Sequence, residues 1–459
     1  MSKSHVLVLP FPAQGHVNPL MDLSHELAKH DIKITFVNTD FIHKQIMKAK
    51  GHKEQVGSDQ IQLASISDGI EQEENRNRHE ILLESIWQVM PKKLEKLIQE
   101  INNEAESEKI SCVVADGTMG WALEVAEKMG IRRGALFWPA SASFLALFLS
   151  IPQFLHDGIF DPEGTKMEDQ SINLAPEMPA MRTTNLIWSN VCDNFNATKI
   201  GFNFLMRSSK VLESIDRVIC NTSLELEAPT IAFAPKILPI GPLQARKSND
   251  IDQSATSFLP EDPNCLNWLD LQQDKSVIYV AFGSLAIYDH IQLQELALGL
   301  ELSNKPFLWV VRSDICNGAN YDFLKEFEDR LSSRGKVVNW APQLKVLSHP
   351  SIACFLSHCG WNSTIEGLIN GLPFLCWPFF CDQFIDENYI CDIWKVGLRF
   401  DRNNGIINRE EVAYKIKKVL IDEGFRMRAL QLKEKTINSV KEGGSSNKKL
   451  KNIVDWIKA

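Results

Sequence analysis

The chain has 459 residues, 44% of them hydrophobic and 23% charged, a composition that fits a globular protein with two separate cores. Its net charge of −9 at pH 7 disfavours nucleic acid as a partner. No basic segment precedes the apolar run that starts at His5, and Pro139 and three serines break the longest apolar stretch, 135–151, so we expect a cytoplasmic protein without stable membrane insertion.

The first half of the chain alternates short apolar strands with amphipathic helices. Strands are predicted at 6–9, 32–37, 111–115 and 135–138, and helices between them at 20–28, 81–101 and 121–129. This alternation is typical of a doubly wound parallel sheet with right-handed crossovers, in which ligands bind beyond the carboxyl ends of the strands. We therefore predict an N-terminal Rossmann-like domain over 1–244.

A loop rich in glycine and proline, 10–19, follows the first strand and contains His16. A neutral imidazole can accept a proton from a hydroxyl near pH 7, which makes His16 a candidate general base. Asp116 follows a later strand of the same predicted sheet and can fix the tautomer of the imidazole and stabilise its protonated form. Judged by position alone, a structural or surface role for His16 stays open as the alternative.

Periodicity weakens between 150 and 217, where methionine and aromatic residues are frequent. Side chains of this kind suit a pocket for a planar or hydrophobic molecule, and the alternative is that each fills core space beneath long loops. The polar segment 245–263 is predicted to be a linker. Asp250-Ile-Asp252 inside it has the spacing of a metal-binding motif, but no strand flanks it, so we expect a solvated linker and no metal.

The second half repeats the alternation, with a helix predicted at 291–302 and strands at 277–282, 307–311 and 336–339. We predict a second Rossmann-like domain over 264–444, followed by a C-terminal segment, 445–459. Gly283 and Ser284 form a tight turn after the first of these strands, where they can donate to a phosphate. No G-x-G-x-x-G or G-x-S-x-G sequence occurs, which disfavours a nicotinamide-dependent enzyme and an α/β-hydrolase.

The segment 340–383 carries the densest pattern of the chain. A buried strand, 352–356, is followed by the turn His358-Cys-Gly360 and by a polar helix start at Trp361–Thr364. Unpaired backbone N–H groups and the positive end of the helix dipole make such a start an anion site. Asp382 and Gln383 follow the next strand and can bind hydroxyl groups, so the pattern predicts a site for a diphosphate. For Asn-Ser-Thr alone, a simple helix cap is the alternative.

Ten cysteines, several of them inside apolar runs, are expected to be reduced core residues. A zinc site built from paired spacings is disfavoured because at least two of its members alternate into strand interiors: Cys354, Cys359, Cys376 and Cys381. The glycosylation sequon at Asn362 lies in the predicted phosphate site, where a glycan would block binding. That placement agrees with a cytoplasmic protein.

All 44 residues from Trp340 to Gln383 resemble the signature of the plant secondary-product glycosyltransferases, including the Trp-Ala-Pro-Gln start and the Asp-Gln end. This signature marks the UDP-sugar site of the plant UDP-glycosyltransferases. The resemblance extends along the whole chain, and the sequence as a whole is similar to the group 83A branch of the family. It implies a GT-B fold, in which two Rossmann-like doubly wound parallel-sheet domains face each other across a cleft, and a C-terminal helix at 445–459 that packs back on the first domain.

The resemblance also implies a role for each matching residue. Trp340 would stack on uracil, the Ala341 backbone would read its edge, and Glu366 would accept the ribose hydroxyls with Gln343 nearby. The residues implied for the diphosphate are Ser284, His358, Gly360, Asn362 and Ser363. The residues implied for the sugar are Trp361, Asp382 and Gln383, and Gln383 resembles the glucose-using members. His16 would be the base and Asp116 its partner. The implied acceptor-binding residues are Gln14, Gly15, Trp87, Met90, Phe144, Phe148, Met181, Trp188, Phe202, Met206 and Phe379.

The implied function is inverting transfer of glucose from UDP-glucose to a hydroxyl of a small hydrophobic plant metabolite, a phenolic, flavonoid, terpenoid or steroid, giving a β-glucoside. We expect a monomer that needs no metal. A UDP-sugar-binding protein without transferase activity, such as a sensor or partner subunit, is the alternative. A nucleotide-sugar epimerase or dehydrogenase is disfavoured, because it requires a nicotinamide-binding fingerprint that the sequence lacks.

Overall fold

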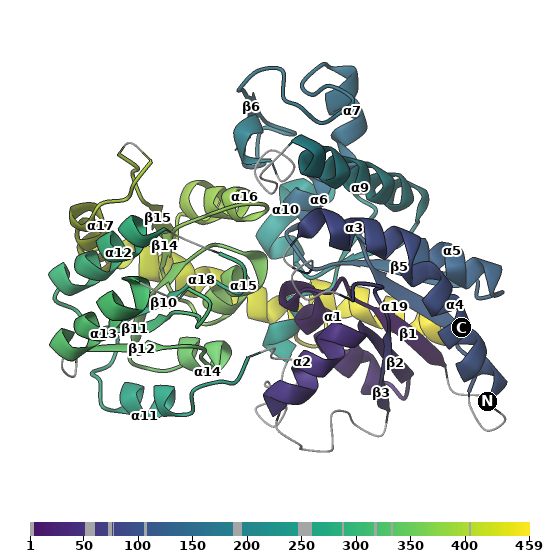
Figure 1. The fold of residues 1–459 in the computed structure, drawn as a ribbon, viewed down its shortest axis with the longest axis horizontal. Coiled ribbons are helices and arrows are strands. Elements are labelled where there is room, and N and C mark those ends of the chain that lie inside the picture. Colours follow the sequence, from purple (N-terminus) through teal and green to yellow (C-terminus); the bar gives the residue numbers. More distant parts are fainter. Residues whose placement is uncertain are drawn as a thin grey trace. The chain divides into compact units, whose positions relative to one another are not determined.

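Two parallel β-sheets organise the chain, one in each of two compact units (Figure 1). Unit 1 comprises residues 1–258 and 438–459, and unit 2 comprises residues 259–437. The computed structural model describes residues 4–50, 60–71, 76, 78–104, 108–186, 195–246, 259–286, 289–315, 319–331, 334–403 and 405–459. The Asp250-Ile-Asp252 motif and Trp188 lie outside the described residues.

The sheet of unit 1 has seven parallel strands in the order β3-β2-β1-β4-β5-β8-β9. They are β1 (His5–Leu9), β2 (Lys33–Thr39), β3 (Ile61–Ile66), β4 (Cys112–Asp116), β5 (Arg133–Trp138), β8 (Val218–Cys220) and β9 (Ile237–Pro239). β1 pairs with β2 on one side and with β4 on the other, so the strand order reverses at β1. This reversal is the doubly wound topology predicted from the sequence.

Helices and one small hairpin complete unit 1. The helices are α1 (Gln14–Ala28), α2 (Asp40–Lys50), α3 (His79–Gln88), α4 (Met90–Asn103), α5 (Trp121–Lys128), α6 (Ala142–Leu149), α7 (Ile151–His156), α9 (Phe195–Ser214), α10 (Leu224–Phe233) and α19 (Ser445–Lys458). The hairpin pairs β6 (Ser171–Ile172) with β7 (Met181–Arg182). Short 3₁₀ turns lie at Thr183–Asn185 and Leu243–Arg246.

The last helix of the chain belongs to the core of unit 1. Four apolar residues of α19, spaced three or four apart, are at most 4% exposed and join the cluster that contains Val6, Val8 and the apolar face of α1: Leu450, Ile453, Val454 and Ile457. In Figure 1, α19 is drawn in yellow among the purple elements of unit 1. The final residues of the sequence therefore complete a core that begins at residue 6.

Two helix boundaries differ from the prediction. The segment 10–19 was predicted to be a loop, but α1 already begins at Gln14, because the Ala13 carbonyl accepts the N–H groups of His16 and Val17 at 2.9 Å each. Pro19 is accommodated inside this helix. The single helix predicted over 81–101 is two helices, α3 and α4, since a proline, Pro91, stands in the first turn of α4.

The sheet of unit 2 has six parallel strands in the order β12-β11-β10-β13-β14-β15. They are β10 (Val277–Ala281), β11 (Phe307–Val310), β12 (Gly335–Val338), β13 (Ile352–Ser357), β14 (Phe374–Cys376) and β15 (Gly397–Arg399). The helices are α11 (Asn264–Asp270), α12 (His290–Leu302), α13 (Ala319–Leu331), α14 (Gln343–Leu347), α15 (Trp361–Ile369), α16 (Gln383–Asn388), α17 (Arg409–Ile421) and α18 (Glu423–Val440), with a π-helical turn at Tyr389–Ile393. The strand order reverses at β10, as it does at β1 in unit 1.

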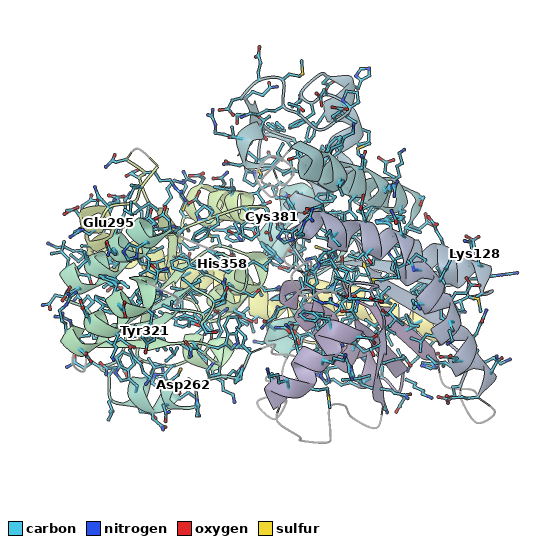
Figure 2. All side chains as sticks on the ribbon, in the orientation of Figure 1. Lys128, Asp262, Glu295, Tyr321, His358 and Cys381 are labelled. Carbon is cyan, nitrogen blue, oxygen red and sulfur yellow. The ribbon has the colours of Figure 1, made fainter. Side chains whose placement is uncertain are left out.

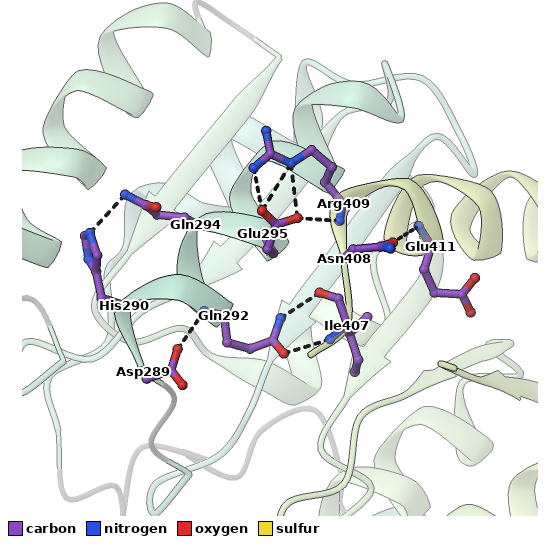
Figure 3. A network of polar contacts seen from close by, with 9 residues as sticks. All are labelled: Asp289, His290, Gln292, Gln294, Glu295, Ile407, Asn408, Arg409 and Glu411. Atoms are coloured by element: carbon purple, nitrogen blue, oxygen red, sulfur yellow. Dashed lines mark hydrogen bonds and ion pairs between the residues drawn. The ribbon is translucent and has the colours of Figure 1, made fainter. Parts of the chain in front are cut away.

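One face of this second sheet packs on α12, α13 and α17. Polar contacts join α12 to the start of α17 (Figure 3). Gln292 exchanges two hydrogen bonds with the backbone of Ile407, at 2.8 and 3.0 Å, and Glu295 pairs with Arg409. These contacts fix the position of α12, the helix that follows the Gly283-Ser284 turn. Among the described residues, no helix is long and apolar enough to cross a membrane.

Candidate active site

The reversal of strand order in unit 1 brings His16 and Asp116 together. His16 lies in the first turn of α1, directly after β1, and Asp116 is the last residue of the neighbouring β4. The His16 Nδ1 and Asp116 Oδ2 atoms are 2.7 Å apart. Where strands diverge in this way, the carboxyl ends of a doubly wound sheet leave a crevice in which ligands bind.

The surroundings of Asp116 prepare it as a partner for an imidazole. The carboxylate is fully buried, and its second oxygen accepts the backbone N–H of Thr118 at 2.9 Å and the Thr118 hydroxyl at 2.7 Å. A carboxylate at Nδ1 favours the tautomer with the proton on that nitrogen, so the basic lone pair of His16 is on Nε2. The side chain of His16 is 31% exposed, which leaves the ring accessible to a substrate.

Aromatic rings continue from His16 into unit 1. The Phe11 ring lies 5.0 Å from His16 and 6.5 Å from Phe204, and Phe204 lies 6.4 Å from Trp87. Only Trp87 belongs to the predicted acceptor residues. Phe11 was missed because it stands in the loop before α1, where no periodic pattern marks it. The row of rings formed by Phe11, Phe204 and Trp87 gives one side of the site an apolar, planar character.

The other predicted acceptor residues are spread over several elements. Gln14 and Gly15 open α1 beside His16, and Met206 is partly exposed on α9. Phe144 and Phe148 pack against each other in α6, with ring centroids 5.3 Å apart. Phe379 belongs to unit 2 and packs edge-on against Phe282 at 5.5 Å. Four of the set are at most 1% exposed and lie in the interior of unit 1: Met90, Phe148, Met181 and Phe202.

In unit 2 the strand order reverses between β10 and β13, and His358 follows β13 there (Figure 2). The pKa of His358 is lowered to about 4, mainly by burial; the Ala281 carbonyl opposes this shift, and the cation of Arg312 adds to it. The imidazole is therefore neutral at pH 7 and has one N–H group, which it donates either to the Ala281 carbonyl or, in the other tautomer, to an anion.

The His358 imidazole occupies space that is open only because Gly283 and Gly360 have no side chains. A methyl group added at Gly283 would lie 2.8 Å from His358 Nε2, and one added at Gly360 would lie 2.6 Å from the same atom. Gly283 also has φ +71°, a conformation that favours glycine. Ser284 follows in the turn and is partly exposed. The turn after β10 and the turn after β13 thus enclose one nitrogen of His358.

The start of α15 has the properties of an anion site. Its N-cap, Gly360, has no side chain to accept from the helix, and the first turn contains no acidic residue. Asn362 is partly exposed, and Ser363 is 7% exposed. Cys359, just before the cap, has φ +66°, which is uncommon for a residue with a side chain. Strained backbone of this kind concentrates at functional sites.

Arg312 fixes the turn after β10, and no sequence pattern indicated this residue. It is 6% exposed, and its Nη1 donates to the carbonyls of Gly283 and Ala286 at 3.0 Å each. Asp314 accepts two further hydrogen bonds from it at 2.9 Å. A buried guanidinium that is paired with Asp314 therefore holds the turn that contains Gly283 and Ser284.

The predicted ribose group is also assembled within unit 2. Gln343, the first residue of α14, donates through Nε2 to Glu366 at 2.8 Å and to Ser363 at 2.9 Å. Trp340 is a partly exposed residue of the preceding loop, and its carbonyl accepts the N–H of Asp262 at 2.9 Å. Ala341 is 5% exposed. The bond between Gln343 and Glu366 joins two residues implied for the same sugar ring.

The predicted sugar contacts have different environments. The Trp361 ring is 2% exposed and lies 6.3 Å from the Trp394 ring, so it is part of the core. Gln383 is 4% exposed, and its side-chain oxygen accepts the N–H groups of Phe379 and Phe380 at 2.8 and 3.2 Å. Asp382 precedes α16 and is partly exposed. The side-chain oxygen of Gln383 thus stabilises the loop at Phe379 and Phe380. Its side-chain NH₂ group is then the part of Gln383 that can donate to a ligand.

The cysteines of unit 2 do not group as their spacing suggested. Cys376 contacts Cys391, with the sulfurs 3.7 Å apart, and Cys359 lies beside them. Burial raises the pKa of Cys359 to about 11 and that of Cys354 to about 12, so these thiols stay protonated at pH 7. In the part of the chain that the structure describes, no group of three or more histidine, cysteine or acidic side chains is placed to hold a metal ion.

Comparison with known proteins identifies the family. Residues 17–436 match the family model described as UDP-glucoronosyl and UDP-glucosyl transferase. The chain belongs to this family. It is therefore a UDP-sugar transferase by descent. It is 46% identical to UDP-glycosyltransferase 83A1 of Arabidopsis thaliana, covering 100% of this chain and 98% of that protein. It is 32% identical to a 7-deoxyloganetin glucosyltransferase of Catharanthus roseus, covering 100% and 97%.

Solved structures of plant family members share the fold. Os79 from O. sativa in complex with UDP matches with a TM-score of 0.81 at 27% identity, covering 98% of this chain and all of that one. A UDP-glucosyltransferase from Polygonum tinctorium capable of glucosylating indoxyl, in complex with 3,4-dichloroaniline, matches with a TM-score of 0.79 at 25% identity, covering 100% and 99%. The fold of this UDP-glycosyltransferase is accordingly GT-B, as the resemblance implied.

Proposed function

We propose that this UDP-glycosyltransferase transfers glucose from UDP-glucose to a hydroxyl of a small hydrophobic plant metabolite, with inversion to the β-glucoside. The observation that carries the proposal is the His16–Asp116 pair, 2.7 Å apart at the strand reversal of unit 1. A UDP-sugar-binding protein without transferase activity would not need a base held by a buried carboxylate. Family membership supports the reaction class, since the relatives are transferases.

In the proposed reaction, His16 Nε2 takes the proton of the acceptor hydroxyl. The acceptor oxygen forms a bond to the anomeric carbon while the bond from that carbon to the diphosphate oxygen breaks. Asp116 stabilises the imidazolium, which keeps the proton until UDP has left. The single displacement inverts the configuration at the anomeric carbon.

Stabilisation of the departing diphosphate is assigned to unit 2. Neutral His358 donates its single N–H in the tautomer that directs this group to the phosphate, the first turn of α15 offers its N–H groups, and Arg312 holds the turn at Gly283. Glu366 and Gln343 would bind the ribose, and Trp340 would stack on the uracil. Gln383 supports glucose as the sugar, because the resemblance associates glutamine at this position with glucose users.

The proposed acceptor is a planar or hydrophobic molecule that carries a hydroxyl group. The row from Phe11 through Phe204 to Trp87 supports this choice. Trp87 Nε1 is buried and has no hydrogen-bond partner among the described residues, so it suits a polar group at the far end of such a molecule. The solved relatives carry small organic ligands, a trichothecene in one and 3,4-dichloroaniline in another.

The test is an acceptor panel of phenolics, flavonoids, terpenoids and steroids with UDP-glucose, UDP-galactose and UDP-xylose, read by mass spectrometry. We expect transfer from UDP-glucose, and β-configured products by NMR. His16→Ala should lower transfer by about 10²- to 10⁴-fold while UDP still binds. His156→Ala, at a side chain 83% exposed, is the matched control and should behave as wild type. Most of the activity surviving in His16→Ala would remove the base assignment, and UDP binding without transfer would favour a binding protein.

A further inference from the structure

A chain of hydrogen bonds connects the interior of the sheet in unit 2 to Glu366. Tyr279 lies in the middle of β10 and is 1% exposed. Its hydroxyl donates to Gln343 Oε1 at 3.2 Å, and Gln343 Nε2 donates to Glu366 Oε2 at 2.8 Å and to Ser363 Oγ at 2.9 Å. One amide group therefore joins a core strand, α14 and the first turns of α15.

The direction of this chain follows from the chemistry of its members. An ionised carboxylate only accepts hydrogen bonds, so the Nε2 group of Gln343 must face Glu366 and its Oε1 must face Tyr279. Tyr279 is then the donor. Burial, and after it the negative charge of Glu366, raises the pKa of Tyr279, so the hydroxyl keeps its proton at neutral pH.

The position of the Tyr279 hydroxyl is fixed by the sheet. Tyr279 pairs in register with Phe355 of the adjacent β13, and their rings stack with centroids 5.2 Å apart and planes 27° apart. Both residues are at most 1% exposed. The hydroxyl is thus a rigid reference point, whereas a glutamine on a short helix such as α14 has three rotatable bonds to restrain.

We propose that Tyr279 is a positioning residue for nucleotide recognition, which acts through Gln343 to orient Glu366 toward the ribose hydroxyls. The proposal rests on the ribose role of Glu366 in the proposed function. Hydrogen bonds weaken steeply when they are misaligned, so a carboxylate that must accept from a ribose needs its oxygens held in place. Tyr279 orients that group from the core and is not itself a nucleotide contact.

The test compares two nucleotides on matched variants. Tyr279→Phe removes the hydroxyl and keeps the stacked ring. Calorimetry on wild type, Tyr279→Phe, Glu366→Ala and the double variant gives the Kd of UDP and of 2′,3′-dideoxy-UDP, which lacks both ribose hydroxyls. Tyr279→Phe should weaken binding of UDP about 3- to 10-fold, the size of one hydrogen bond, and binding of 2′,3′-dideoxy-UDP by less than about twofold. The double variant should bind UDP no more weakly than Glu366→Ala, because the two residues act in series.

A control and a second variant keep the result interpretable. Tyr321→Phe removes the hydroxyl of a tyrosine that is 55% exposed on α13 of the same unit (Figure 2), and it should change neither Kd. If melting curves show that Tyr279→Phe does not fold, Gln343→Leu breaks the same chain nearer the surface. It should likewise reduce the preference for UDP over 2′,3′-dideoxy-UDP, and an unchanged preference there would overturn the proposal.

Other outcomes separate the proposal from the function on which it rests. Unchanged UDP affinity in Tyr279→Phe, together with a loss in Glu366→Ala, overturns the positioning role and leaves the proposed function standing. Equal losses for both nucleotides also overturn it, because a packing defect does not distinguish the ribose hydroxyl. If wild type does not bind UDP, or Glu366→Ala binds it as well as wild type does, the proposed donor site itself is wrong.

Discussion

In the contact between His16 and Asp116, one buried carboxylate oxygen determines which nitrogen of the imidazole ring carries the proton. Thr118 holds one carboxylate oxygen of Asp116 with two hydrogen bonds, and the other oxygen faces His16 Nδ1. An amide in place of the carboxylate would present an N–H group to that nitrogen. The imidazole would then carry its proton on Nε2, where the proposed reaction needs a lone pair.

Asp116→Asn should therefore lower kcat/KM for transfer by about 10²- to 10⁴-fold while the Kd of UDP stays unchanged. Steady-state kinetics with the best acceptor and calorimetry with UDP measure the two quantities. Asp157→Asn is the matched control, since Asp157 forms an exposed pair with His156 at 3.1 Å. A loss of less than about threefold in Asp116→Asn would show that the carboxylate does not set the tautomer.

The lowered pKa of His358 predicts how the free energy of unfolding depends on pH. Its pKa in the folded chain is about 4, below the ordinary value of 6.5, so as the pH falls from 6.5 to 4 the unfolded chain takes up a proton that the native chain does not. The free energy of unfolding must fall over this window. His358→Gln should show a smaller fall, measured by urea unfolding at pH 7 and pH 5. His156→Gln, at an exposed histidine, should follow wild type, and parallel curves for all three proteins would contradict the assignment.

Among the elements, the turn that follows β10 is small and tightly specified. It combines the positive φ of Gly283, the contact with His358 and two carbonyls held by buried Arg312. None of these features has a side-chain periodicity that sequence analysis can detect. The turn itself was predicted because a glycine and a serine follow an apolar strand.

Gly283→Ala should raise the KM for the UDP-sugar by about tenfold or more, since about 1.4 kcal/mol of binding is lost when His358 is displaced. Gly405→Ala is a close control, because Gly405 has φ +83° but no atom of the described residues within 4 Å of the added methyl group. Both variants carry a backbone cost of about 1 kcal/mol, visible as a lower melting temperature. Only Gly283→Ala should affect the donor, and an equal effect of both on KM would contradict the role of the turn.

At the scale of the whole molecule, the chain closes unit 1 with its last helix. Ile457 is fully buried in the core that contains β1 and α1. Ile457→Ala should lower the free energy of unfolding by about 2–5 kcal/mol, whereas Lys458→Ala, at the exposed next residue, should change it by less than about 0.5 kcal/mol. Hydrogen exchange should locate the lost protection in unit 1. Loss confined to residues 259–437 would refute the assignment of α19 to unit 1.

Much of the fold could be predicted because its strands are continuous apolar runs. Val6 to Leu9 and Ile352 to Leu356 are entirely buried, and the alternation with helices indicates a parallel sheet. His16 and Asp116 were predicted to meet because both follow strands of one such sheet. The start of α1 was missed, since Pro19 favoured a loop. The Tyr279–Gln343 bond was missed as well, because the two residues are 64 positions apart and only the folded chain brings them together.

The order in which the chain is synthesised gives the placement of α19 a further meaning. β1 is translated long before α19, so the nascent core cluster that contains residues of α1 and α2 lacks one of its helices until residues 445–458 have been made. Unit 2 is complete before that moment, because its last residue is 437. The first unit, although its translation begins earlier, therefore cannot complete its core until the second unit has been translated as well.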